Sequence, residues 1–192
     1  MSKGEALLGA HDSKRVLIKL LFRSHSVFFL LFLAIVVGCS DLPEGIKPID
    51  DFDLNRYLGD WYKIARLDHY FERGLYDVRA NYSMGEDGGI QIKNFGISST
   101  GEVKEASGKA YFVGSERLGL LKVSFFGFFY SNYIIFFVDE GYQIAFVAGR
   151  NQNYLWLLSR NRFIPESVRD HFIELSTSLG FNTNNLVWSI QR

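Results

Sequence analysis

Residues 57–75, which read YLGDWYKIARLDHYFERGL, decide how the rest of this 192-residue chain folds. Gly59 and Asp60 form a turn signal directly before Trp61, and the run that starts at Trp61 is typical of a β-strand. Successive side chains of a strand point to opposite faces of the sheet. One face is therefore expected to carry Trp61, Lys63, Ala65 and Leu67, and the other Tyr62, Ile64 and Arg66.

The chain after Trp61 is a series of short β-favouring runs separated by turn signals rich in Gly, Asp, Asn and Ser. This rhythm is typical of an antiparallel barrel or sandwich. The expected strands are 61–68, 78–84, 89–97, 103–113, 120–126, 133–139, 142–149 and 154–159. Eight is also the number of strands whose closed barrel can hold one small ligand. We therefore predict an all-β fold built on an eight-stranded antiparallel barrel.

A helix is predicted after the last of these strands. Pro165 suits the first turn of a helix, and Gly180 suits its C-terminal end. Between them, apolar residues recur at helical spacing and form one stripe, made of Val168, Phe172, Leu175 and Leu179. We expect this stripe to pack on the outside of the barrel, and residues 186–190 to add a short final strand.

The Gly59-Asp60-Trp61 triplet, taken together with the distant Arg160, resembles the signature of the lipocalin family. The segments that look like the bacterial outer-membrane lipocalins in particular are 64–66, 68–69, 71–75, 122–127 and 154–156. The resemblance implies an up-and-down barrel whose closed end holds Gly59 and Trp61, with Arg160 packed across the ring of Trp61. It covers nearly all of the chain after the leader.

The leader has the pattern of a secretory signal peptide, because an apolar run at residues 27–37 follows a basic region. The run is too short to span a bilayer comfortably as a helix. Gly38 directly before Cys39 resembles a lipobox, so residues 1–38 are expected to be a lipoprotein signal peptide and Cys39 the lipid-attachment site. A free cysteine within a retained anchor is the alternative. Ser40 after the cysteine favours export to the outer membrane.

Residues 39–50 contain two Pro and one Gly without periodicity, and we expect them to be a lipidated tether to a barrel domain at 51–192. Cys39 is the only cysteine, which excludes a disulfide within the chain and a metal site built on thiolates. After Cys39 there are 16 basic and 19 acidic residues, a net charge of −3. This balance argues against nucleic acid as a partner.

The function of a barrel is expected at its open end. Because connections alternate between the two ends, the open end would receive residues 69–77, 98–102, 127–132 and 150–153. Aromatic residues are frequent in these loops, which suits an acyl chain that enters from a membrane.

The candidate ligand-binding residues are Trp156, Tyr130, Phe112, Phe126, Arg73 and Lys122. The resemblance places Trp156 and Tyr130 where bacterial lipocalins line their fatty-acyl pocket, and strand parity suggests the two phenylalanines. Arg73 and Lys122 are candidates for binding a carboxylate or phosphate head group. The alternatives are a core tryptophan without a ligand and ordinary solvated cations.

No catalytic arrangement is expected. His69 is next to Asp68, but adjacent residues of a strand point to opposite faces, and the chain shows no Ser–His–Asp or metal-ligand pattern. We therefore expect neither a metal nor a cofactor.

The chain is interpreted as a membrane-anchored protein that carries or stores fatty acids or lysophospholipids at the bacterial envelope, on the periplasmic face of the outer membrane. One alternative is an enzyme that acts on a lipid or pigment inside the barrel. The other is a structural lipoprotein whose barrel is filled by its own side chains. Monomer and homodimer are both left open.

Overall fold

A computed structural model describes residues 42–192, which form one compact unit. The expected signal peptide and its acylation site, Cys39, lie outside the described residues. Within residues 42–192, no helix is long and apolar enough to cross a membrane.

The described residues form nine strands and a few helical segments. The strands are β1 (Gly59–Arg66), β2 (Leu75–Met84), β3 (Ile90–Ser98), β4 (Val103–Phe112), β5 (Leu120–Phe126), β6 (Phe129–Val138), β7 (Ile144–Ala148), β8 (Leu155–Ser159) and β9 (Val187–Trp188). The helical segments are α2 (Leu54–Tyr57), α3 (Glu166–Ser178) and the 3-10 turns η1 (Tyr70–Glu72) and η2 (Thr183–Asn185).

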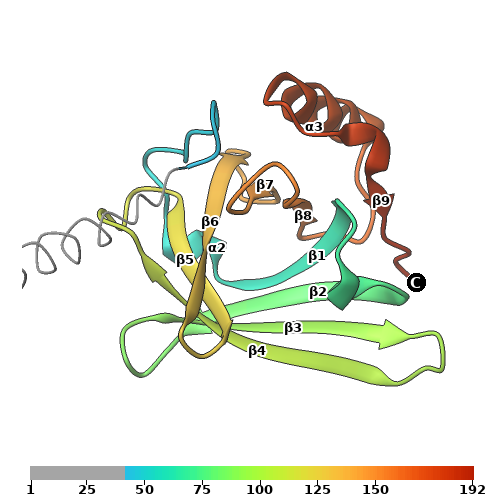
Figure 1. Cartoon of the computed structure of the whole chain (residues 1–192), viewed down its shortest axis with the longest axis horizontal. Coiled ribbons are helices and arrows are strands. Elements are labelled where there is room, and N and C mark those ends of the chain that lie inside the picture. Colours follow the sequence, from blue (N-terminus) through green and yellow to red (C-terminus); the bar gives the residue numbers. More distant parts are fainter. Residues whose placement is uncertain (1–41) are drawn as a thin grey trace, which may run out of the picture. The chain divides into compact units, whose positions relative to one another are not determined.

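The strands form one antiparallel sheet in the order β2-β3-β4-β5-β6-β7-β8-β1-β9. A further pairing of β1 with β2 closes the first eight strands into a barrel. Figure 1 shows these strands arranged in a ring, with α3 outside it. The predicted eight-stranded barrel with one helix and a short final strand is therefore confirmed. The largest boundary difference is in β6, which begins at Phe129 because only two residues separate it from β5.

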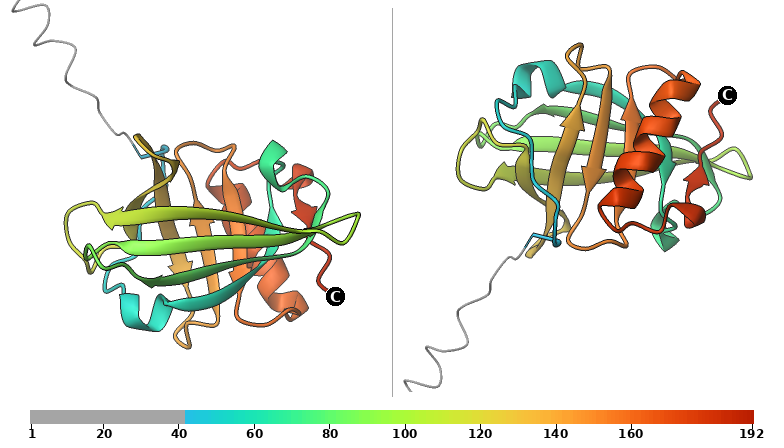
Figure 2. Two further views of the ribbon diagram at one scale, coloured as in Figure 1. Left: turned by 90° about the horizontal axis from the view of Figure 1, so that it is seen from below. Right: turned by 90° about the horizontal axis from the view of Figure 1, so that it is seen from above.

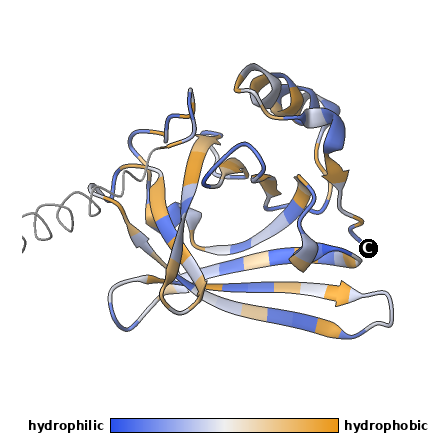
Figure 3. Ribbon diagram, viewed as in Figure 1, coloured by the Kyte–Doolittle hydropathy of each residue, from blue (hydrophilic) through white to orange (hydrophobic). Residues whose placement is uncertain are grey.

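Two cores hold the unit together, one on each side of the barrel wall. The inner core includes Trp61, Tyr82 and Leu121. The outer core lies between the wall and α3, where the ring of Phe172 is 4.9 Å from the ring of Phe146 in β7. Figure 2 shows α3 lying across the outside of the barrel wall, as the apolar stripe predicted. Polar and apolar residues alternate along β2, β3 and β4 (Figure 3), because these strands have one face toward the interior and one toward solvent.

A β-bulge in β1 changes which side chains enter the barrel. The pairing of β1 with β8 shifts between Lys63 and Ala65, so that Ile64 is one extra residue on β1. Ala65 and Leu67 consequently belong to the outer core, although simple alternation placed them with Trp61. Lys63, before the bulge, and Arg66, after it, both point inward. The expected faces of this strand are therefore wrong from Ala65 onward.

The segment before the barrel packs on the wall instead of forming a free tether. Ile46 is only 3% exposed within the outer core. Ile49 accepts a hydrogen bond from the backbone N–H of Gly119 and donates one to the carbonyl oxygen of Ile135, both at 2.9 Å. The expectation of a tether thus fails for residues 42–50, because their apolar side chains find partners on the wall.

Candidate functional site

The closed end of the barrel is built around Trp61, which is fully buried. The guanidinium carbon of Arg160 lies 3.9 Å from the centre of the Trp61 ring, the arrangement that the sequence resemblance implies. Gly59 has a φ of 95°, and a Cβ added to it would lie 3.4 Å from Arg160 Nη1. A side chain at this position would therefore be strained.

Arg160 also terminates the short helix α2. Its Nη2 donates hydrogen bonds to the carbonyl oxygens of Arg56, Tyr57 and Leu58 at 2.8, 3.1 and 2.8 Å. Its Nη1 donates to the carbonyl oxygen of Asp60 at 2.7 Å. The last carbonyl groups of a helix lack partners within it, so one guanidinium joins the end of α2 to the start of β1.

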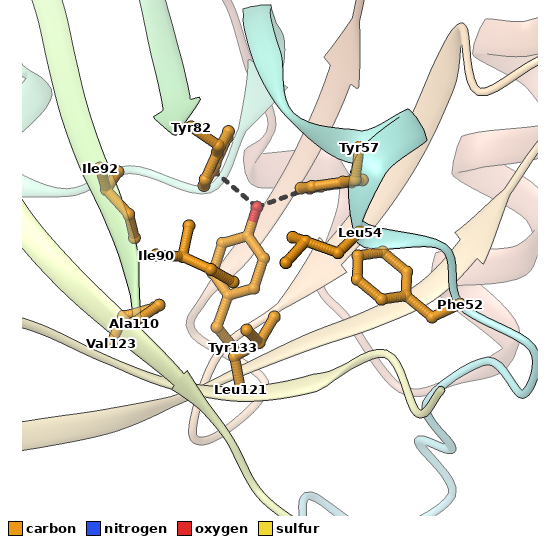
Figure 4. Close-up of a pocket in the computed structure, with 10 residues that line it drawn as sticks. All are labelled: Phe52, Leu54, Tyr57, Tyr82, Ile90, Ile92, Ala110, Leu121, Val123 and Tyr133. Atoms are coloured by element: carbon orange, nitrogen blue, oxygen red, sulfur yellow. Dashed lines mark hydrogen bonds between the residues drawn. The ribbon is translucent and has the colours of Figure 1, made fainter. Parts of the chain in front are cut away.

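A small apolar cavity lies inside the barrel, next to this closed end. Figure 4 shows the residues that line it, namely Phe52, Leu54, Tyr57, Tyr82, Ile90, Ile92, Ala110, Leu121, Val123 and Tyr133. Its volume is about 10 Å³, which leaves room for roughly one water molecule. Side chains therefore fill most of the bottom of the barrel.

Three tyrosine hydroxyls meet in this cavity wall. The hydroxyl of Tyr133 forms hydrogen bonds of 2.7 Å with those of Tyr57 and Tyr82. Burial raises the pKa of Tyr82 to about 12 and raises the pKa values of Tyr57 and Tyr133 well above their usual 10.0. These hydroxyls consequently stay protonated at neutral pH. They form the one polar group in the otherwise apolar lining of the cavity.

Four ionisable side chains are buried between the end of β1 and the following connection. Lys63 and Arg66, 6% and 4% exposed, come from β1. His69 and Glu72, 7% and 4% exposed, come from the connection to β2. Charged residues are rarely this buried unless they are paired, so their partners decide what the cluster can bind.

Glu72 pairs with both cations. Lys63 Nζ donates to Glu72 Oε1, and Arg66 Nε lies 3.2 Å from Oε2. Arg66 Nη2 also donates to the main-chain oxygen of Glu72 at 3.0 Å. Burial opposes ionisation, but Lys63 and Arg66 outweigh it and hold the pKa of the Glu72 carboxyl below its usual 4.5. Arg66 Nη1 also lies 3.4 Å from Oδ1 of Asp68, but the Asp68 side chain is 42% exposed and pairs with Arg73 at 2.6 Å. The two buried cations therefore share one buried carboxylate, which leaves an excess of positive charge among the buried side chains.

His69 is stacked against its neighbours at the edge of this cluster. Its ring lies 5.2 Å from that of Phe71 and 4.7 Å from that of Tyr154, with nearly parallel planes. Its Nε2 atom is buried and has no hydrogen-bond partner among the described residues. Burial lowers the pKa of His69 below its usual 6.5, so the ring is neutral at neutral pH.

Two of the predicted ligand-binding residues face the barrel interior. Trp156 packs against the inner core and donates its Nε1–H to Glu72 Oε2 at 3.4 Å. This places it directly beside the charged cluster. Phe112 also packs against the inner core, where its ring lies 6.1 Å from that of Phe52. Phe112 therefore belongs to the closed half of the barrel.

Tyr130 and Lys122 lie on the outside of the wall. Lys122 is directly opposite Tyr111 in the β4–β5 pairing and so shares its outward face. Tyr130 is 46% exposed, with its ring 6.1 Å from that of Tyr111. Neither side chain lines the barrel interior here, because their positions in β5 and β6 have outward parity. Their contact with a ligand stays a prediction.

Phe126 and Arg73 are also outside the interior. Phe126 is 75% exposed at the end of β5, after a register shift that follows Val123. The Arg73 side chain is 65% exposed and pairs with Asp68 at 2.6 Å. Phe126 therefore does not line the interior in this arrangement. Arg73 stays a candidate for a head group at the open end.

Sequence reasoning missed the cluster of Lys63, Arg66 and Glu72. The alternation rule placed Lys63 and Arg66 on opposite faces, and only the bulge brings both inside. One signal was present: three ionisable residues lie in the same short stretch that carries the family signature.

The fold and the cluster together define a class of protein, a closed β-barrel with a buried cationic site above an apolar bottom. A family model described as a lipocalin-like domain matches residues 52–191. The chain is 51% identical over 169 residues to the outer membrane lipoprotein Blc of Vibrio cholerae, covering 87% of this chain and 99% of that one. It is 43% identical over 157 residues to Blc of Escherichia coli K12, covering 80% and 89%. This chain belongs to the lipocalin family.

Solved structures show the same fold at low sequence identity. Insecticyanin from the tobacco hornworm Manduca sexta is similar with a TM-score of 0.62 and 19% identity, covering 78% of this chain and 85% of that one. The cockroach allergen Per a 4 gives a TM-score of 0.61 and 18% identity, covering 79% and 96%. These similarities concern the fold alone.

Proposed function

We propose that this chain is a membrane-anchored lipid-binding lipocalin, which carries or stores fatty acids or lysophospholipids at the outer membrane of a bacterium. The relatives from Vibrio cholerae and Escherichia coli are named outer membrane lipoproteins, and the sequence predicts acylation of Cys39. These observations support the location. The chemistry of the ligand is argued from the barrel itself.

The observation that carries the proposal is the excess positive charge of the buried cluster. Lys63 and Arg66 are almost inaccessible to water and share one buried carboxylate, Glu72. The second carboxylate near Arg66, that of Asp68, belongs to a side chain that is 42% exposed, and it pairs more closely with Arg73. A buried charge without a partner costs several kcal/mol. The carboxylate of a fatty acid or the phosphate of a lysophospholipid would supply the missing negative charge through charge-assisted hydrogen bonds.

The apolar interior below the cluster suits the acyl chain. Burial stabilises an acyl chain by about 0.8 kcal/mol per methylene, part of which is lost to ordering. Because the cavity near the closed end has only about 10 Å³, the chain must displace side chains to reach the bottom. Phe112, which is only partly buried against the inner core, is well placed to move.

We assign no catalytic activity to the cluster. Both carboxylate oxygens of Glu72 already have partners, and the pKa of this carboxyl is lowered by the neighbouring cations. Glu72 is therefore a poor proton donor at neutral pH. The neutral ring of His69 is held between two aromatic rings, which suits a packing role.

Charge-changing variants test the head-group site in opposite directions. The soluble form, residues 40–192, contains both cores and all strand pairings of the described unit. Glu72→Gln should bind hexadecanoic acid about tenfold more tightly, because it leaves two cations for the ligand. Arg66→Gln should bind it about tenfold more weakly, because the Lys63–Glu72 pair is then neutral. A tenfold change corresponds to about 1.4 kcal/mol, and titration calorimetry measures it.

Three comparisons complete this test. Lys109→Gln, which alters a cation that is 53% exposed and pairs with Asp87 on the outside of the barrel, should leave affinity unchanged. Hexadecanol, which has the same chain without the charge, should not distinguish the variants. Trp156→Ala should lose lipid that co-purifies at one molecule per barrel in native mass spectrometry. A parent protein that carries no lipid and binds no added fatty acid would instead support the barrel filled by its own side chains.

A further inference from the structure

The hairpin between β5 and β6 exposes three phenylalanine side chains to solvent. Phe126, Phe128 and Phe129 are 75%, 99% and 81% exposed. Gly127, with a φ of 69°, makes the tight turn that holds them together. Clustered apolar side chains on a surface mark an interaction site more often than scattered ones do. The tip of this hairpin is therefore a candidate interaction surface.

The connection between β1 and β2, across the barrel from this hairpin, lies at the same end. Tyr70 is 76% exposed and Phe71 is 49% exposed. At the closed end, none of the large exposed hydrophobic residues of the described chain lies in the three hairpin connections, 85–89, 113–119 and 139–143. The exposed aromatic residue there, Phe163, follows β8 and stands alone. The exposed aromatic surface is therefore concentrated at the open end, above the cationic cluster.

The N-terminal segment determines what faces this aromatic surface. Residues 42–50 are fixed to the wall by the burial of Ile46 and the hydrogen bonds of Ile49. In both views of Figure 2 this segment runs along the barrel from α2 toward the ends of β5 and β6 that their hairpin joins. Cys39 is three residues before residue 42, and three residues span at most about 10 Å. An acyl group on Cys39 would hold the open end, and not the closed end, close to the bilayer.

We infer that the open end of the barrel docks on the phospholipid bilayer, with Phe126, Phe128 and Phe129 inserted among the lipids. This inference rests on the proposed function, because it uses the acylation of Cys39. Aromatic side chains are favoured in the interfacial region of a membrane. Arg150, an exposed cation in the connection between β7 and β8, would lie at the level of the phosphate groups. In this orientation a lipid enters the barrel directly from the membrane without crossing water.

Site-specific labelling tests this orientation in the full lipoprotein. Acylation consumes the thiol of Cys39, the chain's only cysteine, so Phe128→Cys introduces one reactive thiol for an environment-sensitive fluorophore. Phe163→Cys is the matched control, because Phe163 is 79% exposed and follows β8 at the closed end. The labelled proteins are reconstituted in vesicles of phosphatidylethanolamine and phosphatidylglycerol, after mass spectrometry has verified acylation. Quenching by nitroxide-labelled lipids and by aqueous iodide is then measured.

The label at position 128 should be quenched by nitroxide lipids at least several-fold more than the label at position 163, and iodide should give the reverse order. Equal quenching of the two positions, or stronger lipid quenching at position 163, overturns the inference.

A second measurement keeps this inference separate from the proposed function. In the soluble form, the double variant Phe128→Ser/Phe129→Ser should bind the same vesicles at least tenfold more weakly, while its affinity for hexadecanoic acid in solution stays unchanged. If the parent and the variant bind vesicles equally, the inference that these phenylalanines insert into the bilayer is overturned, whether or not Cys39 is acylated. If the parent itself does not bind hexadecanoic acid, the proposed function is overturned instead.

Discussion

Arg160 has a role that no other side chain type can fill. Its planar guanidinium stacks on Trp61 and donates to several carbonyl oxygens of α2 and β1 at once. A lysine carries the same charge on a single nitrogen and cannot match this geometry. The sequence-level pairing of Trp61 with Arg160 therefore reflects a real requirement at the closed end.

Replacing this arginine should cost stability even when the charge is kept. We expect Arg160→Lys to lower the free energy of unfolding by roughly 2–4 kcal/mol, because several hydrogen bonds to a charged group are lost. Urea unfolding followed by tryptophan fluorescence measures the change. Arg162→Lys, at an exposed position two residues further on, should stay within about 0.5 kcal/mol of the parent. A similar loss in both variants would mean that the geometry at Arg160 does not matter.

At the scale of elements, the bulge in β1 is the feature that creates the candidate site. Without Ile64 as an extra residue, Arg66 would take the outward parity of Tyr62. The bulge instead brings Arg66 inside, opposite Trp156 of β8. One irregular position in one strand therefore decides the charge of the barrel interior.

Helix α3 contributes to stability and should contribute little to ligand choice. Phe172 is fully buried against Phe146 on the outer side of the wall. Phe172→Ala should lower the free energy of unfolding by about 3–5 kcal/mol, as expected for a large aromatic removed from a core. Thermal unfolding measures this loss, and Glu174→Ala on the exposed side of the helix is the control. Hexadecanoic acid should bind the folded variant with unchanged affinity; a weaker affinity would show that the helix shapes the site.

For the whole molecule, buried titratable groups limit the pH range of greatest stability. The pKa of His69 is 6.5 in the unfolded chain and lower in the folded protein. Between the folded and the unfolded pKa, the unfolded chain therefore binds more protons than the folded protein. The free energy of unfolding should therefore fall as pH decreases below 6.5, and Glu72 should add a further loss below 4.5. The folded pKa values of Tyr57, Tyr82 and Tyr133 exceed 10.0, so stability should also fall as pH rises above 10.0.

Chemical unfolding from pH 5 to pH 11 should thus give a plateau bounded near pH 6.5 and 10.0. His69→Gln should reduce the fall in the free energy of unfolding below pH 6.5, and Tyr133→Phe should reduce the fall above pH 10.0. If His69→Gln keeps the full slope just below pH 6.5, another group is responsible for it.

The sequence by itself determined the architecture, because the barrel follows from patterns that are local in the chain. Turn signals and β-favouring runs set the number of strands, and the stripe on α3 set the position of the helix outside the wall. The resemblance of Gly59, Trp61 and Arg160 to the lipocalin signature implied which end is closed. Each of these signals depends only on near neighbours or on a motif that can be read directly.

Only the tertiary structure decided which side chains enter the barrel. The bulge at Ile64 reversed the parity of Arg66, and the parity of β5 and β6 turned Lys122 and Tyr130 outward. Residues 42–50 pack on the barrel wall because apolar side chains and backbone hydrogen-bonding groups of the wall contact them there. Register and bulges depend on pairing between strands that are distant in sequence. For that physical reason, alternation along one strand predicted the fold and could not predict the site.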